Sequence, residues 1–381
     1  MRRNAPVRVL HSVGSMNRGG IETSLIHLLR RIDRRRFRMD FLVRTSRPAA
    51  YDSEVESLGS KVIACPDPTR PWQFIPALKK ALREHGPYDI VHCYSLHYAT
   101  GAILHYAAQM GIPGRIAHSR DDATYVASMS VAHRIAAAIT RRLVRKHAVI
   151  GLAISSSAAQ NMFGPNWKSD RRVAILPGAV DFDPFHERVD PREVRAQLGI
   201  PDNAFVVGHV GRFDEVKNYG FIIKTMQEVV REQPDAYLLL IGDGPLRPQI
   251  ERNAAEAGVR NRTIFAGSRS DVPRLLLGAV DVFVFPSLSE GLGLAVIEAQ
   301  AAGLPCVCSD GVPAETDVVH SLVNRMSLGQ PAAEWARRIV GLRNTDRIAQ
   351  PGALETVEGS LCNVRANVRE LENVYSRFAA Q

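Results

Sequence analysis

The chain has 381 residues, of which 45% are hydrophobic and 23% are charged. This composition is ordinary for a globular protein and excludes a disordered chain, and the length predicts two domains of roughly 150–200 residues each. The formal net charge is +9 and unevenly spread, since residues 1–180 hold 27 Lys and Arg against 12 Asp and Glu, whereas the remainder holds 21 against 27.

No run of about 18 or more uncharged apolar residues occurs. The N-terminal stretch MRRNAPVRVLHSVGSM passes from arginines directly into a short strand, without a cleavable apolar segment. We therefore expect a cytoplasmic protein that does not span a membrane. The cysteines have no metal-ligand spacing and are expected to be inert core thiols; they are Cys65, Cys93, Cys306, Cys308 and Cys362.

Short apolar strands alternate with helical patterns along the chain. In the first half, a helix is expected at 21–32 and strands at 7–13, 38–44, 61–66, 88–94, 114–119 and 148–155. The pattern restarts with strands at 205–213, 236–244, 261–267, 281–287 and 304–310. Alternating strands and helices indicate parallel sheets with right-handed crossovers. We predict an α/β fold of two Rossmann-like, doubly wound parallel-sheet domains.

A proline-rich segment at 175–194 has little helical periodicity and marks the predicted linker. We place the domains at 1–180 and 181–365, followed by a last helix at 366–381 that packs back across the linker. Doubly wound domains bind ligands beyond the carboxyl ends of their strands. The expected site is therefore a cleft where the two sheets face each other.

The loop GSMNRGGIE follows the first strand and opens the first helix, so the backbone N–H groups of Gly19 and Gly20 are placed to approach an anion. Gly14 and Gly19 have the spacing of a Walker motif. However, Gly20 and Ile21 stand where Lys and Ser or Thr are required, and no GxGxxG pattern is present. ATP hydrolysis and nicotinamide binding both lose support.

The stretch GRFDEVKN follows a predicted strand and places Arg212 and Lys217 at the strand's carboxyl end. An arginine fork and a lysine point charge can clamp a diphosphate without a metal, although two solvated surface cations are the alternative. The turns at 241–245 and 265–272 likewise end strands in glycines.

The stretch SEGLGLAVIEAQAAG, residues 289–303, places Glu290 in a loop and Glu298 on the following helix. Gly291 and Gly293 allow close backbone approach, and the helix N-terminus at Leu294 presents amides between the two carboxylates. Carboxylates accept hydrogen bonds from sugar hydroxyls, while amides and cations bind phosphate. This layout predicts a sugar nucleotide as ligand, against the alternative that Glu298 is merely solvated.

Seven motifs in this order resemble the retaining family 4 glycosyltransferases with the GT-B fold, and among these the bacterial exopolysaccharide and capsule branch. They are MNRGGIE, RIAHSR, LPGAVDFDPF, GRFDEVKN, IGDGPL, FAGSRSDV and the two glutamates eight positions apart. The resemblance implies transfer of a sugar from a nucleotide-diphosphate sugar, with a UDP-sugar favoured, to a glycan or polyprenyl-diphosphate-linked acceptor. It implies no metal and no cofactor, and it makes 1–180 the acceptor-side domain and 181–365 the nucleotide-sugar-binding domain.

The resemblance also implies roles for individual residues. Arg212 and Lys217 would bind the donor diphosphate, Glu298 the ribose hydroxyls and Glu290 the hydroxyls of the donor sugar. The backbone amides of Gly291, Leu292, Gly293 and Leu294 would assist, with Leu292 in place of the family's usual aromatic residue. His118 would lie near the sugar, and Gly19 and Gly20 would line the cleft. The catalytic set is thus Glu290, His118, Arg212 and Lys217.

Two other functions stay open, a sugar-nucleotide epimerase and a non-catalytic sugar-nucleotide-binding protein. A metal site at Asp181 and Asp183 is not expected, because the two carboxylates lie in the predicted linker and Arg212 and Lys217 already supply positive charge.

Residues 133–148 predict a helix with a basic side, and the alternative is an ordinary solvated face. Its cations are Arg134, Arg141, Arg142, Arg145 and Lys146. Such a helix can rest on the anionic cytoplasmic leaflet, so we expect peripheral membrane contact. Nucleic-acid binding is not expected, because no basic motif interleaved with aromatic residues accompanies it.

Overall fold

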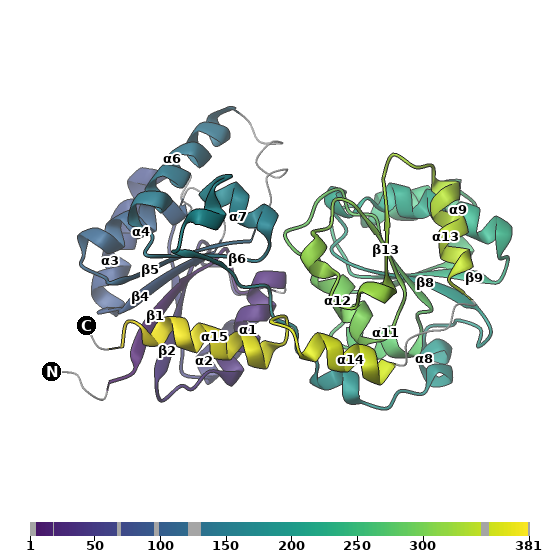
Figure 1. The fold of residues 1–381 in the computed structure, drawn as a ribbon, viewed down its shortest axis with the longest axis horizontal. Coiled ribbons are helices and arrows are strands. Elements are labelled where there is room, and N and C mark those ends of the chain that lie inside the picture. Colours follow the sequence, from purple (N-terminus) through teal and green to yellow (C-terminus); the bar gives the residue numbers. More distant parts are fainter. Residues whose placement is uncertain are drawn as a thin grey trace. The chain divides into compact units, whose positions relative to one another are not determined.

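The structure, a computed structural model, describes residues 5–17, 19–66, 70–94, 99–120, 131–343 and 350–379. The chain divides into two compact units. Unit 1 is Met1–Ala179 together with Val364–Gln381, and unit 2 is Val180–Asn363. Each unit is a parallel sheet with helices on both faces (Figure 1), which confirms the predicted α/β fold of two Rossmann-like domains.

Unit 1 is built on a seven-stranded parallel sheet in the order β3-β2-β1-β4-β5-β6-β7. The strands are β1 (Val7–Ser12), β2 (Phe37–Val43), β3 (Val62–Ala64), β4 (Ile90–Tyr94), β5 (Gly114–Ser119), β6 (Ile150–Ala153) and β7 (Val173–Ile175). The order reverses between β1 and β4, which makes this the topological switch point of the sheet.

The helices of unit 1 cover the two faces of the sheet. One face packs against α1 (Gly20–Arg31), α2 (Asp52–Ser57) and α15 (Val364–Ser376). The other packs against α3 (Pro71–His85), α4 (Ala99–Gln109), α6 (Val131–His147) and α7 (Ser156–Phe163). The inner strands β2, β1, β4, β5 and β6 are buried on both sides, which is why they appear in the sequence as nearly continuous apolar runs.

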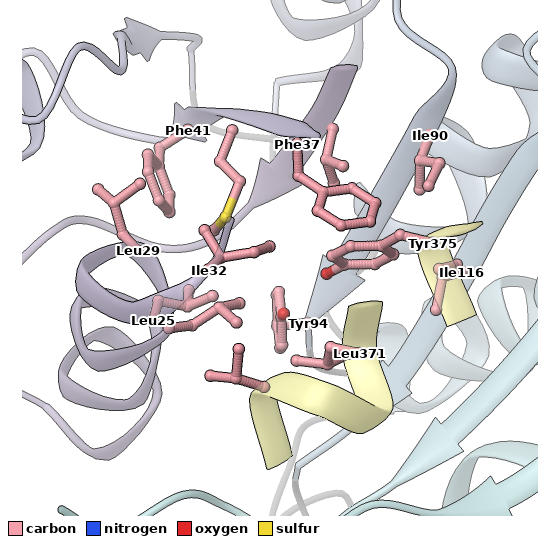
Figure 2. Close-up of a cluster of buried hydrophobic side chains, with 14 of the residues drawn as sticks. Leu25, Leu29, Ile32, Phe37, Phe41, Ile90, Tyr94, Ile116, Leu371 and Tyr375 are labelled. Atoms are coloured by element: carbon pink, nitrogen blue, oxygen red, sulfur yellow. The ribbon is translucent and has the colours of Figure 1, made fainter. Parts of the chain in front are cut away.

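The last helix, α15, belongs to the core of unit 1 (Figure 2). Its Leu371 and Tyr375 are buried among side chains of α1 and of the sheet, including Leu25 and Phe37. The apolar spacing of Val364, Val368 and Leu371 in the sequence is therefore the face that α15 buries.

Unit 2 is built on a six-stranded parallel sheet in the order β10-β9-β8-β11-β12-β13. The strands are β8 (Phe205–Val210), β9 (Ala236–Ile241), β10 (Thr263–Gly267), β11 (Val282–Phe285), β12 (Cys306–Ser309) and β13 (Val323–Met326). The helices are α8 (Pro191–Gln197), α9 (Tyr219–Glu232), α10 (Arg247–Glu256), α11 (Val272–Gly278), α12 (Leu294–Ala301), α13 (Ala332–Gly341) and α14 (Gln350–Glu358). Here the switch point lies between β8 and β11.

Two strands, β7 and β13, escape prediction from the sequence. Both lie at sheet edges and are three or four residues long, and none of their residues is fully buried. Asn324 and Arg325 in β13 also break the apolar pattern by which a strand is identified.

All five cysteines are buried and free of disulfides, and burial raises the pKa of the Cys65 and Cys362 thiols to about 11. Within the part of the chain that the structure describes, no helix combines the length and apolar character needed to cross a membrane.

Candidate functional site

Most of the predicted site residues lie at the switch point of unit 2, beyond the carboxyl ends of β8 and β11. Two loops extend from these neighbouring strands, at 211–218 and 286–293. They are tied together, because the Leu288 N–H donates to the Val216 carbonyl over 2.8 Å and Asn218 Nδ2 donates to the Pro286 carbonyl over 3.2 Å. Asn218 adopts the left-handed conformation, with φ of 58°, where the short turn η3 (Glu215–Lys217) passes into α9.

Lys217 and Glu290 meet across these two loops. Lys217 Nζ lies 2.5 Å from Glu290 Oε1, and the two side chains are only 17% and 13% exposed. The ammonium also lies 4.7 Å from the centre of the Phe285 ring. The lysine stem crosses Gly211, where an added Cβ would lie 3.2 Å from Lys217 Cε. The ammonium is therefore held in one place by a carboxylate and a ring.

Arg212 lies one residue beyond that glycine and has an exposed side chain. None of the residues that the structure describes forms a side-chain hydrogen bond or an ion pair with its guanidinium. The neighbouring Phe213 is fully buried and anchors the backbone. An exposed fork of donors on an anchored backbone is suited to an external anion.

The N-terminus of α12 presents backbone amides beside this pair. Gly293 precedes the helix with φ of 93°, a conformation that strongly favours glycine. Across the described residues, no acceptor is bonded to the N–H groups of Gly291, Leu292, Gly293, Leu294 or Ala295. Leu292 has a buried side chain, 2% exposed, and its carbonyl accepts a hydrogen bond from Thr316 Oγ1. Of Leu292, only the backbone N–H is therefore available to a ligand.

Glu298 lies on α12 and differs from Glu290. Its side chain is half-buried, and no donor or cation among the residues that the structure describes contacts its carboxylate. Burial raises the pKa of Glu298 to about 7. A partly desolvated carboxylate without a partner among the described residues is suited to accept hydrogen bonds from ligand hydroxyls.

Sequence reasoning missed two aromatic neighbours of Lys217. One is Phe285, the last residue of β11, and the other is the buried His209 on β8. His209 Nδ1 donates to the Val284 carbonyl over 2.9 Å, and burial lowers its pKa to about 3, so the ring is neutral. In the sequence, both residues occupy positions typical of a buried strand core. The available signal is that each lies at the end of a strand that leads into one of the two loops.

Gly19, Gly20 and His118 lie in unit 1, at the carboxyl ends of β1 and β5. The helix α1 begins at Gly20 and follows Gly19. An added Cβ on Gly19 would lie 2.5 Å from Glu22 Oε2, so a carboxylate sits beside this glycine. Burial raises the pKa of Glu22.

His118 lies at the end of a buried chain of hydrogen bonds. It is 2% exposed, with Nε2 3.3 Å from the Leu176 carbonyl and Nδ1 3.3 Å from His92 Nε2. The other ring nitrogen of His92, Nδ1, lies 2.8 Å from the Tyr375 hydroxyl. Burial, and then the nearby Arg120, hold the pKa of His118 well below its usual value. His118 is therefore a neutral histidine with both ring nitrogens engaged.

Asp181 and Asp183 lie at the start of unit 2, where Asp181 Oδ1 accepts the Asp183 N–H over 3.3 Å. Within the described ranges, no group of three or more His, Cys, Asp or Glu side chains is placed to hold a metal ion.

The basic helix predicted at 133–148 is α6. From residue 134 onward, where the structure describes the side chains, its exposed residues are Arg134, Ile135, Ala138, Ile139, Arg142, Arg145 and Lys146, which we call the α6 surface. Ile135 and Ile139 are 58% and 56% exposed. Arg141 lies at the edge of this surface, where it is half-buried and its Nη2 donates to Asn161 Oδ1 of α7 over 2.7 Å.

Two Rossmann-like units, one with an arginine, an ion-paired lysine and helix amides at its switch point, have the architecture of the GT-B glycosyltransferases. The family model described as Glycosyltransferase Family 4 matches residues 18–184, and the model described as Glycosyl transferases group 1 matches residues 190–344. The chain therefore belongs to the group 1/family 4 glycosyltransferases.

The relatives agree with that assignment. The chain is 34% identical over 374 residues to the putative glycosyltransferase EpsF of Bacillus subtilis, covering 97% of this chain and 96% of that protein. It is 29% identical over 247 residues to the UDP-Gal:alpha-D-GlcNAc-diphosphoundecaprenol alpha-1,3-galactosyltransferase of Escherichia coli, covering 61% and 60%. Anabaena Alr3699/HepE, solved in complex with UDP, shares the fold with a TM-score of 0.80 at 20% identity, covering 98% and 100%.

Proposed function

We propose that this glycosyltransferase moves a hexose, with retention of configuration and without a metal, from a nucleotide-diphosphate sugar to a glycan or polyprenyl-diphosphate-linked acceptor. The favoured donor is a UDP-sugar, and the favoured role is synthesis of exopolysaccharide or another cell-surface polysaccharide. One observation carries the proposal: the switch point of unit 2 brings together Arg212, Lys217, Glu290, Glu298 and the amides at the start of α12, which have no acceptor among the described residues. The names of EpsF and of the Escherichia coli galactosyltransferase, and the UDP held by HepE, support it.

Each group at this switch point suits one part of the donor. The exposed Arg212 fork, the Lys217 ammonium and the amides at the start of α12 would bind the diphosphate. Glu298 would accept hydrogen bonds from the ribose hydroxyls. Glu290 would accept hydrogen bonds from hydroxyls of the sugar. In the donor the sugar is bonded to the diphosphate, and in the site Glu290 lies 2.5 Å from Lys217, which would bind that diphosphate.

The reaction breaks the bond between the anomeric carbon and the diphosphate oxygen, and forms a bond from that carbon to the acceptor oxygen. Negative charge develops on the leaving diphosphate, where fixed cations and amides lower the barrier. The proton of the acceptor hydroxyl passes to the leaving phosphate oxygen on the same face of the sugar, as the resemblance implies. Glu290 is ion-paired with Lys217, which favours a binding role over attack on the sugar.

The α6 surface supports contact with an anionic membrane, where a lipid-linked acceptor would be found. Two exposed isoleucines among cations suit insertion at the headgroup level, and each cation contributes about 1 kcal/mol near an anionic surface. We expect co-sedimentation with phosphatidylglycerol vesicles that is lost in the double variant Ile135→Ser, Ile139→Ser and in Arg142→Glu. The control is Leu361→Ser, an exposed apolar residue of unit 2. Equal sedimentation of all variants would contradict membrane contact.

The function is tested by incubating the protein with a panel of nucleotide sugars, with and without membrane lipid extract. Free nucleotide, epimerised donor and lipid-linked sugar are followed together. We expect nucleotide release that depends on the extract, together with labelled lipid, and both should persist in excess EDTA. Epimer formed without an acceptor would favour an epimerase, and binding without turnover would favour a non-catalytic protein. If EDTA abolishes transfer and added Mn²⁺ or Mg²⁺ restores it, a metal site at Asp181 and Asp183 must be considered again.

A further inference from the structure

The loop that carries Glu290 is held in place by a second segment, residues 309–317, which begins at the last residue of β12. Ser309 Oγ donates to the Ser287 carbonyl over 2.5 Å, and the Gly311 carbonyl accepts the Glu290 N–H over 3.1 Å. Thr316 Oγ1 donates to the Leu292 carbonyl. We call residues 309–317 the support loop, because it bonds the donor loop, residues 286–293, at three points.

The two loops also touch without hydrogen bonds. An added Cβ on Gly311 would lie 2.5 Å from the Leu288 carbonyl oxygen, so the support loop has no room to shift toward the donor loop. Gly293 faces Val312, whose Cγ1 would lie 3.2 Å from an added Cβ. A displacement of the support loop therefore moves Glu290 and the start of α12.

Arg325 on β13 holds the support loop from the other side. Its Nη1 donates to the carbonyls of Ser309 (3.0 Å) and Val312 (2.5 Å), and its Nη2 to the carbonyl of Pro313 (2.9 Å). Its Nε and Nη2 also bond the two carboxylate oxygens of Asp317, at 3.1 and 2.5 Å. One guanidinium thus bonds four residues of a nine-residue loop, and a lysine cannot reproduce this fork.

We propose that Arg325 is a positioning residue for the donor site. It acts through the support loop, which sets the position of Glu290 and of the amides at the start of α12. Removing the fork leaves the Val312 carbonyl without its donor and the Asp317 carboxylate without its cation, whereas the Ser309 and Pro313 carbonyls still accept from the N–H groups of Val312 and Thr316. The loop must then rearrange around an unsatisfied carbonyl and an unpaired carboxylate. The expected effects on UDP binding and transfer rest on the proposed function, whereas the expected effect on the position of the Glu290 loop does not.

The test compares Arg325→Lys with Arg195→Lys. Arg195 is a matched control in unit 2, because it bonds the carbonyls of Asp202, Ala204 and Ala279 and the carboxylate of Asp281, away from the donor loop. We expect Arg325→Lys to speed amide exchange at Glu290, which is bonded to Gly311, and to weaken UDP binding. Transfer should fall about tenfold or more in kcat/KM. Arg195→Lys should lower the free energy of unfolding but leave amide exchange at Glu290, UDP binding and the kcat/KM for transfer unchanged.

A second variant keeps the inference falsifiable if Arg325→Lys does not fold. Thr316→Val retains Arg325 and breaks only the support loop's bond to Leu292, so it should weaken UDP binding in the same direction. A folded Arg325→Lys with unchanged exchange at Glu290 and unchanged UDP affinity would overturn the inference. If the wild type binds no nucleotide, the proposed function fails instead, while the exchange measurement still decides the role of Arg325.

Discussion

The two units have the same topology at their switch points but carry different side chains at the carboxyl ends of their strands. In unit 2 the loops beyond β8 and β11 carry a cation–carboxylate pair and the amides at the start of α12, with Glu298 on the following helix; among the described residues, neither these amides nor the Glu298 carboxylate has a partner. In unit 1 the carboxyl end of β5, the strand beside the switch strand β4, carries His118, which is neutral and bonded through both ring nitrogens. The comparison teaches that a doubly wound sheet supplies the place for a ligand, whereas the side chains decide whether charge is available there.

Lys217→Ala should have the largest effect, because it removes a cation from the position where the leaving diphosphate gains charge. We expect kcat/KM to fall on the order of 10²–10³-fold, measured with the donor that the panel identifies. The control is Lys224→Ala, an exposed lysine on α9 of the same unit. Near-normal turnover in a folded Lys217→Ala protein would show that the switch point of unit 2 does not take part in the reaction.

Glu298→Ala and Glu290→Ala should separate the two carboxylates. Glu298→Ala should weaken binding of the free nucleotide diphosphate by roughly 1–3 kcal/mol, the value of a lost charge-assisted hydrogen bond. Glu290→Ala should spare that binding, since Lys217 loses only its internal partner, and should mainly depress transfer. Calorimetry beside turnover measures both, and equal loss of affinity in the two variants would refute this division.

The raised pKa of Glu298, about 7, predicts a pH dependence. Nucleotide affinity should rise between about pH 6 and pH 8 as the carboxylate ionises and becomes a pure acceptor. The nucleotide's own phosphate titrates nearby, so the comparison is with Glu298→Gln, which should lose the part of the rise that Glu298 supplies. Parallel curves for the two proteins would show that this carboxylate does not titrate on binding.

The same pKa predicts the sign of a stability change. The pKa of Glu298 in the folded protein lies above its ordinary value of 4.5. The contribution of Glu298 to the free energy of unfolding is therefore fully present below pH 4.5 and is lost as the pH rises through 7. Glu298→Gln should therefore melt at the same temperature as the wild type at pH 4 and at a higher one at pH 8. A constant difference across this range would contradict the assignment.

Tyr375→Phe should have the smallest effect and should remain within unit 1. It removes the hydroxyl bonded to His92 over 2.8 Å, which costs about 1 kcal/mol of unfolding free energy. Nucleotide affinity, which we assign to unit 2, should not change. The control is Tyr106→Phe, which keeps the ring beneath Lys79. A change of nucleotide affinity in Tyr375→Phe alone would show that the two switch points are coupled.

The sequence predicted the fold well where strands are buried on both faces, because such strands are continuous apolar runs between turns. It failed at β7 and β13, which are short, lie at sheet edges and are only partly buried. Edge strands are defined by their pairing with a neighbour, as β13 pairs with β12, and pairing leaves little mark in the sequence.

The candidate site was predictable as residue types at strand ends but not as contacts. Lys217 and Glu290 were assigned to separate parts of the donor, whereas their pairing across 73 positions of sequence depends on β8 lying beside β11. Arg325 could not have been found from the sequence, because its partners are mostly backbone carbonyls, which have no sequence signature. The desolvation that raises the pKa of Glu298 likewise comes from packing.

The position of α15 has a consequence for synthesis on the ribosome. Unit 2 is a continuous stretch of chain and has all its residues once Asn363 has emerged. Unit 1 starts first but lacks α15, so the apolar face formed by side chains such as Leu25 and Phe37 stays uncovered while nearly two hundred further residues are translated. A nascent chain that stalls before Val364 exposes this face to chaperones and proteases, and α15 covers it only after all of unit 2 has been translated.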